Sequence, residues 1–239
     1  MTKTPSPHAV IHQRALDFWL ARGAVVVIAG LQMLFVNSNL SIGPKWLGPA
    51  IELAILAPLS VGTAWTQQRA RVATKQEHWI QVAGYRRLIR HVALLLTVLV
   101  MLMNFEALIQ VVRALIAGTK GPSGQSLLID ALNIWFTNVV VFALWYWTID
   151  AGGPASRGLS KRTAPDFLFP QMLGSGDKDP GWSPGFIDYF YVSFTNATAF
   201  SPTDTMPLSP LSKILMSIEA AVSLLTVGIV AARAVNILS

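Results

Sequence analysis

Polar side chains that could hold a proton or an ion recur inside the apolar stretches of this sequence. Between residues 211 and 238 a mostly polar series follows steps of three and four positions, as Ser212, Met216, Glu219, Ser223, Thr226, Val230 and Arg233. Steps of this size place side chains on one face of an α-helix. The opposite face consists of Leu, Ile, Val and Ala. The sequence therefore predicts an apolar helix with one polar stripe, on which Glu219 is the acid.

Two interpretations of this polar stripe remain open. The stripe can line a watery path, or Ser223 and Thr226 can hydrogen-bond to neighbouring helices while Ala221 and Gly228 allow close packing. Ionisable residues at membrane depth are costly and mark functional sites by default. For Glu219 we therefore favour a functional role, whereas the two hydroxyl residues fit both interpretations.

Three further acids lie in or beside apolar stretches: Glu52, Glu106 and Asp130. Burial favours the protonated form of a carboxyl group, so Glu52 and Glu106 are candidates for carrying a proton. A place near the membrane surface is the alternative for both. Asp130 and Arg113 lie at the two ends of a short connection, where a structural ion pair would account for them.

Signatures of soluble enzymes and of metal sites are absent. The chain has no cysteine, no H-E-x-x-H motif and no G-x-S-x-G motif, which removes the thiolate, zinc-protease and serine-hydrolase patterns. Its four histidines lie outside the centres of the apolar stretches. We expect no enzyme activity, no catalytic residue, no metal and no cofactor. The net charge of +6 comes from basic residues between apolar stretches, which favours cytoplasmic loops over a nucleic-acid partner.

The elements that carry these residues are predicted to be membrane helices. The 239 residues are 53% hydrophobic and only 13% charged, with a mean hydropathy of +0.50, which is typical of an all-α integral membrane protein. Residues 67–91 hold six basic residues against one acid, so the amino terminus is expected in the cytoplasm. About five spans are expected, at residues 18–36, 49–65, 92–117, 127–149 and 211–238. The expected single domain comprises a cytoplasmic tail (1–17), a four-span region (18–149), a polar insert (150–185) and a last part (186–239).

Prolines divide the last part of the chain. Pro202, Pro207 and Pro210 prevent one helix from running through residues 186–238, because proline lacks a backbone donor and restricts the residue before it. Irregular backbone at membrane depth survives only where it is buried in protein or lines a watery cavity. Residues 186–200 are therefore expected either to cross the membrane or to dip into it and return. The basic Arg233 near the end favours crossing.

Residues 194–235, FTNATAFSPTDTMPLSPLSKILMSIEAAVSLLTVGIVAARAV, resemble the pore segment of potassium channels. In that family a pore helix, a Thr-Val-Gly-Tyr-Gly-Asp filter and an inner helix follow one another. The resemblance covers the last quarter of the chain and implies a homo-oligomer, tetrameric if the geometry holds, that handles inorganic ions in a lipid bilayer. It places the pore-helix end and the filter positions at Thr195, Thr198, Ala199, Phe200, Ser201, Pro202, Thr203 and Asp204.

The filter positions depart from the potassium-channel pattern. Ser201 and Thr203 replace both glycines, and Pro202 replaces the tyrosine. Glycine supplies backbone angles that are costly for other residues, so a carbonyl filter selective for potassium is not expected. The resemblance implies instead a constriction with low or altered selectivity for cations.

The chain as a whole also resembles a bacterial family of uncharacterised multi-span membrane proteins, through PDFLFP at 165–170, IDYFYVSFT at 187–195 and TDT at 203–205. This resemblance implies the bacterial inner membrane and no particular activity. The leading hypothesis is an ion channel-like protein in which Thr198, Ser201, Thr203 and Asp204 contact the ion and Glu219 sets cation preference. One alternative is a non-conducting membrane scaffold or accessory subunit. The other is a proton-coupled transporter that uses Glu52, Glu106 or Asp130.

Overall fold

The computed structural model describes residues 7–35, 46–72, 76–117, 124–154, 164–173, 182–198 and 204–238. Their fold is almost entirely helical, as predicted. The helices are α1 (Pro7–Phe35), α2 (Leu47–Val72), α3 (Gln76–Ala117), α4 (Gly124–Ile149), α5 (Phe186–Thr198) and α6 (Pro210–Leu238). Short 3-10 turns occur at η2 (Asp150–Gly152) and η3 (Pro170–Met172), and two short strands at β1 (Phe167–Leu168) and β2 (Met206–Pro207).

Four of the described helices are long and apolar enough to cross a membrane. The segments concerned are Leu16–Leu34, Leu88–Ile116, Gln125–Gly152 and Pro210–Ala232. The fifth predicted span lies in α2, whose apolar run, Leu47–Gly62, is shorter than the others. Four of the five predicted spans thus coincide with helices that could cross a membrane, and the fifth span is not confirmed.

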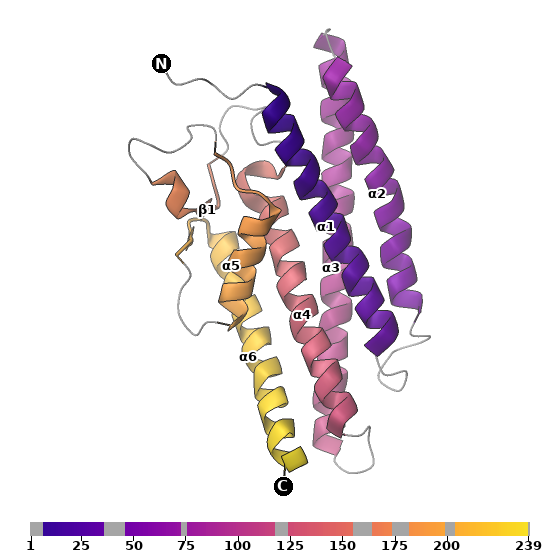
Figure 1. The fold of residues 1–239 in the computed structure, drawn as a ribbon, viewed down its shortest axis with the longest axis vertical. Helices are drawn as coiled ribbons and strands as arrows, with labels where there is room; N and C mark the ends of the chain where they lie inside the picture. Colours follow the sequence, from indigo (N-terminus) through magenta and orange to yellow (C-terminus); the bar gives the residue numbers. More distant parts are fainter. Residues whose placement is uncertain are drawn as a thin grey trace.

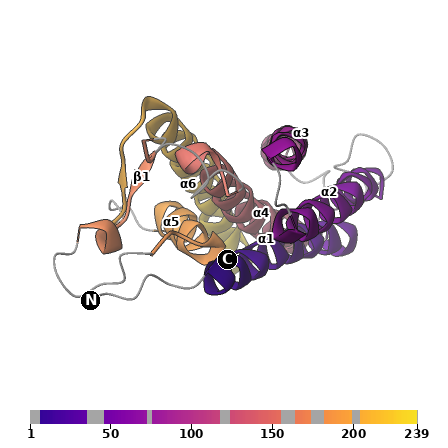
Figure 2. The same cartoon turned by 90° about the horizontal axis from the view of Figure 1, so that it is seen from above.

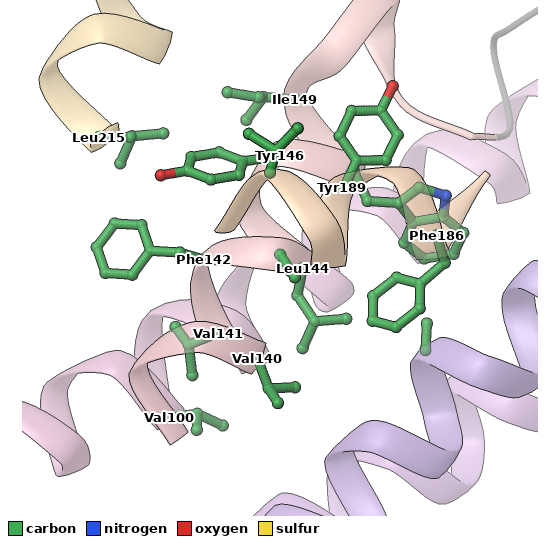
Figure 3. Packing of buried hydrophobic residues seen from close by; sticks show 14 of the residues in the cluster. Val100, Val140, Val141, Phe142, Leu144, Tyr146, Ile149, Phe186, Tyr189 and Leu215 are labelled. Carbon is green, nitrogen blue, oxygen red and sulfur yellow. The ribbon is translucent and has the colours of Figure 1, made fainter. Parts of the chain in front are cut away.

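Helix α4 is the centre of the bundle. Of its apolar span 72% is buried inside the protein, whereas the corresponding spans of α1, α3 and α6 are only 22–33% buried. The remaining helices lie on its two sides, with α1, α2 and α3 on one side and α5 and α6 on the other (Figure 2). An aromatic and aliphatic core fills the space between α4 and α5, including Tyr146, Tyr189 and Phe186 (Figure 3).

The segment after α5 returns to the end of the bundle from which α5 started. Helix α5 has 13 residues and is about 20 Å long at 1.5 Å per residue, which is less than the roughly 30 Å of a hydrocarbon core. Strand β2 then pairs antiparallel with β1, with Phe167 opposite Pro207, and Leu208 N donates to Asp166 O at 2.8 Å. The chain therefore returns to the end of the bundle at which α5 begins.

Helices α5 and α6 consequently point in the same direction, away from the carboxyl end of α4 (Figure 1). The start of α1 lies at that same end, because Phe186 N donates to Asp17 Oδ1 at 3.0 Å. The charge on Arg233 favoured the crossing arrangement. Main-chain pairing instead holds the segment before α6 against the polar insert, at the end of the bundle where α5 begins.

Candidate functional site

Glu219 lies at the junction of α4, α5 and α6, and its side chain is completely buried. It is the tenth residue of α6, about 14 Å from the start of that helix. A hydrocarbon core is roughly 30 Å thick, so Glu219 lies near half depth if α6 spans it. The predicted acid of the polar stripe is thus enclosed by protein on all sides.

Three uncharged donors from two helices surround the Glu219 carboxyl group. Tyr146 Oη of α4 donates to Oε2 at 2.5 Å, and Asn196 Nδ2 of α5 donates to the same oxygen at 2.6 Å. Ser193 Oγ, also on α5, is hydrogen-bonded to Oε1. Ser193 and Asn196 are three positions apart and therefore share one face of α5. The hydrogen bonds of Glu219 come from neutral groups, so this network holds a carboxyl group without an ion pair.

The hydrogen bonds of Ser193 are compatible with both the neutral and the ionised form of Glu219. Ser193 Oγ is also 2.6 Å from Val139 O, and a hydroxyl group has only one proton to donate. When Ser193 donates to Val139 O, the contact with Glu219 Oε1 needs the proton of a neutral carboxylic acid. When Glu219 is ionised, the hydroxyl of Ser193 turns and donates to it instead. Rotation of one hydroxyl group therefore satisfies both states.

The orientation of the Asn196 amide is fixed by two acceptors. Its Nδ2 donates to Met216 O at 3.0 Å as well as to Glu219, and an amide nitrogen carries two protons for two such bonds. Asn196 thus ties α5 to α6 through both a backbone carbonyl and the carboxyl group.

Ser223 and Thr226 of the polar stripe also face the protein interior. Asn138 Nδ2 of α4 donates to Ser223 Oγ at 2.9 Å and to Glu219 O at 3.4 Å. Thr226 Oγ1 donates to Val222 O of its own helix at 2.7 Å, and Ser223 and Thr226 are both buried. The interpretation that hydroxyl groups bond between helices is confirmed for Ser223. Within one chain, the stripe is a packing seam against α4.

The residues at the predicted filter positions are only partly described. Thr195 Oγ1 and Thr198 Oγ1 donate to carbonyls of their own helix, Tyr191 O and Phe194 O, each at 2.7 Å. Asp204 is exposed in the bend before β2. The other filter positions, Ala199, Phe200, Ser201, Pro202 and Thr203, lie outside the described residues.

The other three acids belong to separate helices and have different surroundings. Glu52 of α2 is completely buried, and Asp130 is buried near the start of α4. Glu106 of α3 is half-buried and accepts a hydrogen bond from Gln110 Nε2 at 3.2 Å. Arg113, the suggested partner of Asp130, is exposed.

Sequence reasoning did not identify the groups that hold Glu219. Asn138 and Tyr146 are eight positions apart in an almost wholly apolar helix, and Ser193 and Asn196 lie in a short aromatic one. Polar residues at helical spacing on α4 and α5 were therefore a usable signal. Nothing in the sequence, however, paired them with a residue 73 or 26 positions away.

A second buried acid, Asp150, fixes the start of α5 to the polar insert. Asp150 Oδ1 accepts hydrogen bonds from Asp166 N at 2.6 Å and Phe167 N at 3.3 Å, and Oδ2 accepts one from Tyr189 Oη. The end of α4, strand β1 and α5 are thereby joined through one carboxyl group.

Comparisons with known proteins leave the chain without a relative to which the site could be matched. No family model, no curated protein and no solved structure matches it. The contacts around Glu219 and the path of α5 are therefore the basis on which a function is proposed.

Proposed function

We propose that this protein is an ion channel-like membrane protein, in which several copies join α5, residues 199–203 and α6 into a path for inorganic ions. The observation that carries the proposal is the path of the chain around α5. A short helix of 13 residues is followed by chain that returns to the same end of the bundle, and a long helix follows. Broken helices and irregular backbone at membrane depth are found where they line a cavity or are buried in protein.

The Glu219 network supports this proposal because it fixes α5 at that depth. Donors from α4 and α5 converge on the carboxyl group of α6, so the end of the short helix has a defined position. A permeation path needs fixed groups at close quarters. Glu219 is thus a positioning residue in this proposal, which replaces the earlier hypothesis that its charge faces the ion.

In this proposal Asp204, instead of Glu219, supplies the negative charge beside the ion path. Asp204 is the last of the filter positions, and its side chain is exposed. Rings of carboxylates in an oligomer attract cations. The proposed preference is for cations, with low selectivity among them, because the glycines of a carbonyl filter are replaced.

Flux measurements on purified protein in liposomes test the proposal. Wild-type protein is expected to release a potassium or sodium gradient, and Asp204→Asn is expected to reduce cation over anion preference several-fold. Glu106→Gln, on the half-buried acid of α3, is the matched control and should leave flux unchanged. Equal preference in wild type and Asp204→Asn would count against a path that passes Asp204.

The two alternatives have outcomes of their own in the same assay. Wild-type protein that folds, assembles and passes no ion would identify a non-conducting scaffold or accessory subunit. The buried carboxyl groups of Glu219 and Glu52 favour a proton-coupled transporter as the second candidate. That candidate requires flux that needs a pH gradient and is lost in carboxyl-to-amide variants.

A further inference from the structure

Glu52 is a buried acid that takes no part in the α4–α6 unit. It lies five residues after the start of α2, and its side chain is completely buried. Neither of its carboxyl oxygens makes a hydrogen bond of normal geometry with a described residue. An ionised carboxylate in such a place is strongly disfavoured. The position therefore calls for a ligand that neutralises the charge.

Gln32 of α1 is the polar side chain within reach of the Glu52 carboxyl group. Only 8% of it is exposed, and its Oε1 also lacks a hydrogen-bond partner. The register of the two helices agrees with this proximity. Arg22 Nη2 of α1 is 3.4 Å from Ser60 O of α2, and the two helices run in opposite directions. Gln32 lies ten residues after Arg22 on α1, and Glu52 lies eight residues before Ser60 on α2, so both lie on the same side of that contact.

No cation of α1 or α2 lies level with Glu52. Arg22 is about 12 Å away along the bundle, since eight residues of α2 separate Ser60 from Glu52. The guanidinium group of Arg22 is hydrogen-bonded to Ser60 O there, and its Cζ lies 5.3 Å from the centre of the Trp19 ring. Between residues 47 and 62 of α2, Glu52 itself is the one titratable side chain.

Helices α3 and α4 contribute no cation at this level either. Gly48 lies against Met103 and Gly62 against Ile89, so Glu52 is level with residues 95–103 of α3. The polar side chain in that stretch is Thr97, which donates to Ala93 O at 2.9 Å. Glu106 lies beyond it with Gln110 as its partner. Helix α4 packs against α1, and its charged residue in this half of the bundle is Asp130, which is an acid and not a cation.

We propose that Glu52 is a proton-binding site, in which the neutral acid shares its proton with the Gln32 amide across the α1–α2 interface. In the protonated state the O–H of Glu52 donates to Gln32 Oε1, which satisfies both groups. When the proton leaves to the solution, the amide turns and its N–H donates to the carboxylate. One amide can serve both states because it carries an acceptor and a donor.

A proton fits this site better than a metal ion. Two carboxyl oxygens and one amide oxygen are three ligands, whereas calcium takes six to eight oxygen ligands and magnesium six in near-octahedral order. A proton needs one acceptor and one donor. The site is independent of the proposed ion path, because α1 and α2 lie on the other side of α4 (Figure 2).

Infrared difference spectroscopy of the full chain in lipid nanodiscs tests the site directly. Raising the pH from mildly acidic to alkaline is expected to remove a carbonyl-stretch band of protonated carboxyl groups in wild type. Glu52→Gln is expected to lack the Glu52 component of that band, whereas Glu106→Gln retains it. Gln32→Leu is expected to shift the frequency of the component, since the acid loses its hydrogen-bond acceptor.

The following outcomes would overturn the proposal. A folded Glu52→Gln protein whose band equals that of wild type would show that Glu52 is not a protonated acid. A Glu52 component that disappears on adding sodium at constant pH would identify a metal cation as the ligand. Should Glu52→Gln fail to fold, an unshifted component in folded Gln32→Leu would itself contradict proton sharing. None of these results depends on ion flux, so the proposed function can fail or stand separately.

Discussion

At the scale of single residues, the site around Glu219 is built from neutral donors. Tyr146, Ser193 and Asn196 all bond the carboxyl group. Tyr146 and Ser193 are completely buried, and Asn196 is half-buried. A buried donor that loses its acceptor costs about 1–3 kcal/mol. The network therefore stabilises the contact between α4, α5 and α6, and substitution of its members should affect stability more than substitution of similar residues outside it.

Replacing Tyr146 with phenylalanine removes one donor and keeps the ring. We expect Tyr146→Phe to lower the free energy of unfolding by about 1–3 kcal/mol, because Glu219 loses a strong hydrogen bond in an enclosed site. Tyr191→Phe is the matched control on α5, since Tyr191 is 54% exposed, and an exposed change should stay within about 0.5 kcal/mol. Denaturation in detergent micelles measures both, and equal losses would contradict the role of the network.

Replacing Glu219 itself distinguishes a neutral acid from a carboxylate. Glutamine has the shape of the neutral acid, accepts from Tyr146 and Asn196, and can donate to Ser193. Glu219→Gln is therefore expected to keep most of the thermal stability, whereas Glu219→Leu leaves those donors without an acceptor and should lose about 2 kcal/mol or more. A glutamine variant as unstable as the leucine variant would indicate that the site requires the ionised form.

At the scale of elements, α5 is held at its first turn as well as at its end. Asp150 joins η2, β1 and Tyr189 of α5, and Asp188 Oδ2 caps the helix by accepting from Gly185 N at 2.7 Å. The turn that positions Asp150 has left-handed backbone, with φ of 80° at Gly152 and 88° at Gly153. The return of the chain after α4 thus depends on glycine.

Gly153→Ala tests this turn. Its φ of +88° is unfavourable for alanine, and an added Cβ would lie 2.7 Å from Thr148 O. We expect a loss of about 1–3 kcal/mol in unfolding free energy. Gly228→Ala in α6 is the control, because nothing lies within 4 Å of its added Cβ and alanine favours a helix. Equal losses of thermal stability in Gly153→Ala and Gly228→Ala would contradict the role of glycine in this turn.

At the scale of the whole molecule, basic residues are concentrated at one end of the bundle. The end of α2, the start of α3 and the first turn of α6 hold Arg69, Arg71, Arg86, Arg87, Arg90 and Lys213. The opposite end has Arg113 and Arg233 among the described residues. Excess positive charge marks the cytoplasmic side. We therefore expect α5 to enter from the cytoplasm and the carboxyl terminus to lie outside.

The absence of cysteine from the chain makes this orientation measurable with single introduced thiols. Leu173→Cys and Met206→Cys, both at exposed positions near the β1–β2 pair, should react with an impermeant maleimide from the cytoplasmic side. Gln125→Cys, exposed at the start of α4, should react from the other side. Labelling of positions 173 and 206 from opposite sides would mean that the chain crosses between them.

Much of the fold was predictable because its signals are local. Apolar runs of span length give α1, α3, α4 and α6, and the prolines at 202–210 separate α5 from α6. The Glu219 stripe follows from helical spacing alone. The site's other half was not predictable in this way, because Tyr146 and Ser193 have no local feature that assigns them to Glu219.

The sequence by itself determined which segments are helical, that the last one has a polar face, and that an irregular segment precedes it. Those properties depend on hydrophobic periodicity and proline chemistry within a few turns of chain. Only the tertiary structure decided that the polar face packs against α4 and that the chain after α5 returns to the end of the bundle where α5 begins. These outcomes depend on hydrogen bonds between residues far apart in sequence, such as Leu208 with Asp166 and Glu219 with Tyr146, whose partners are set by packing.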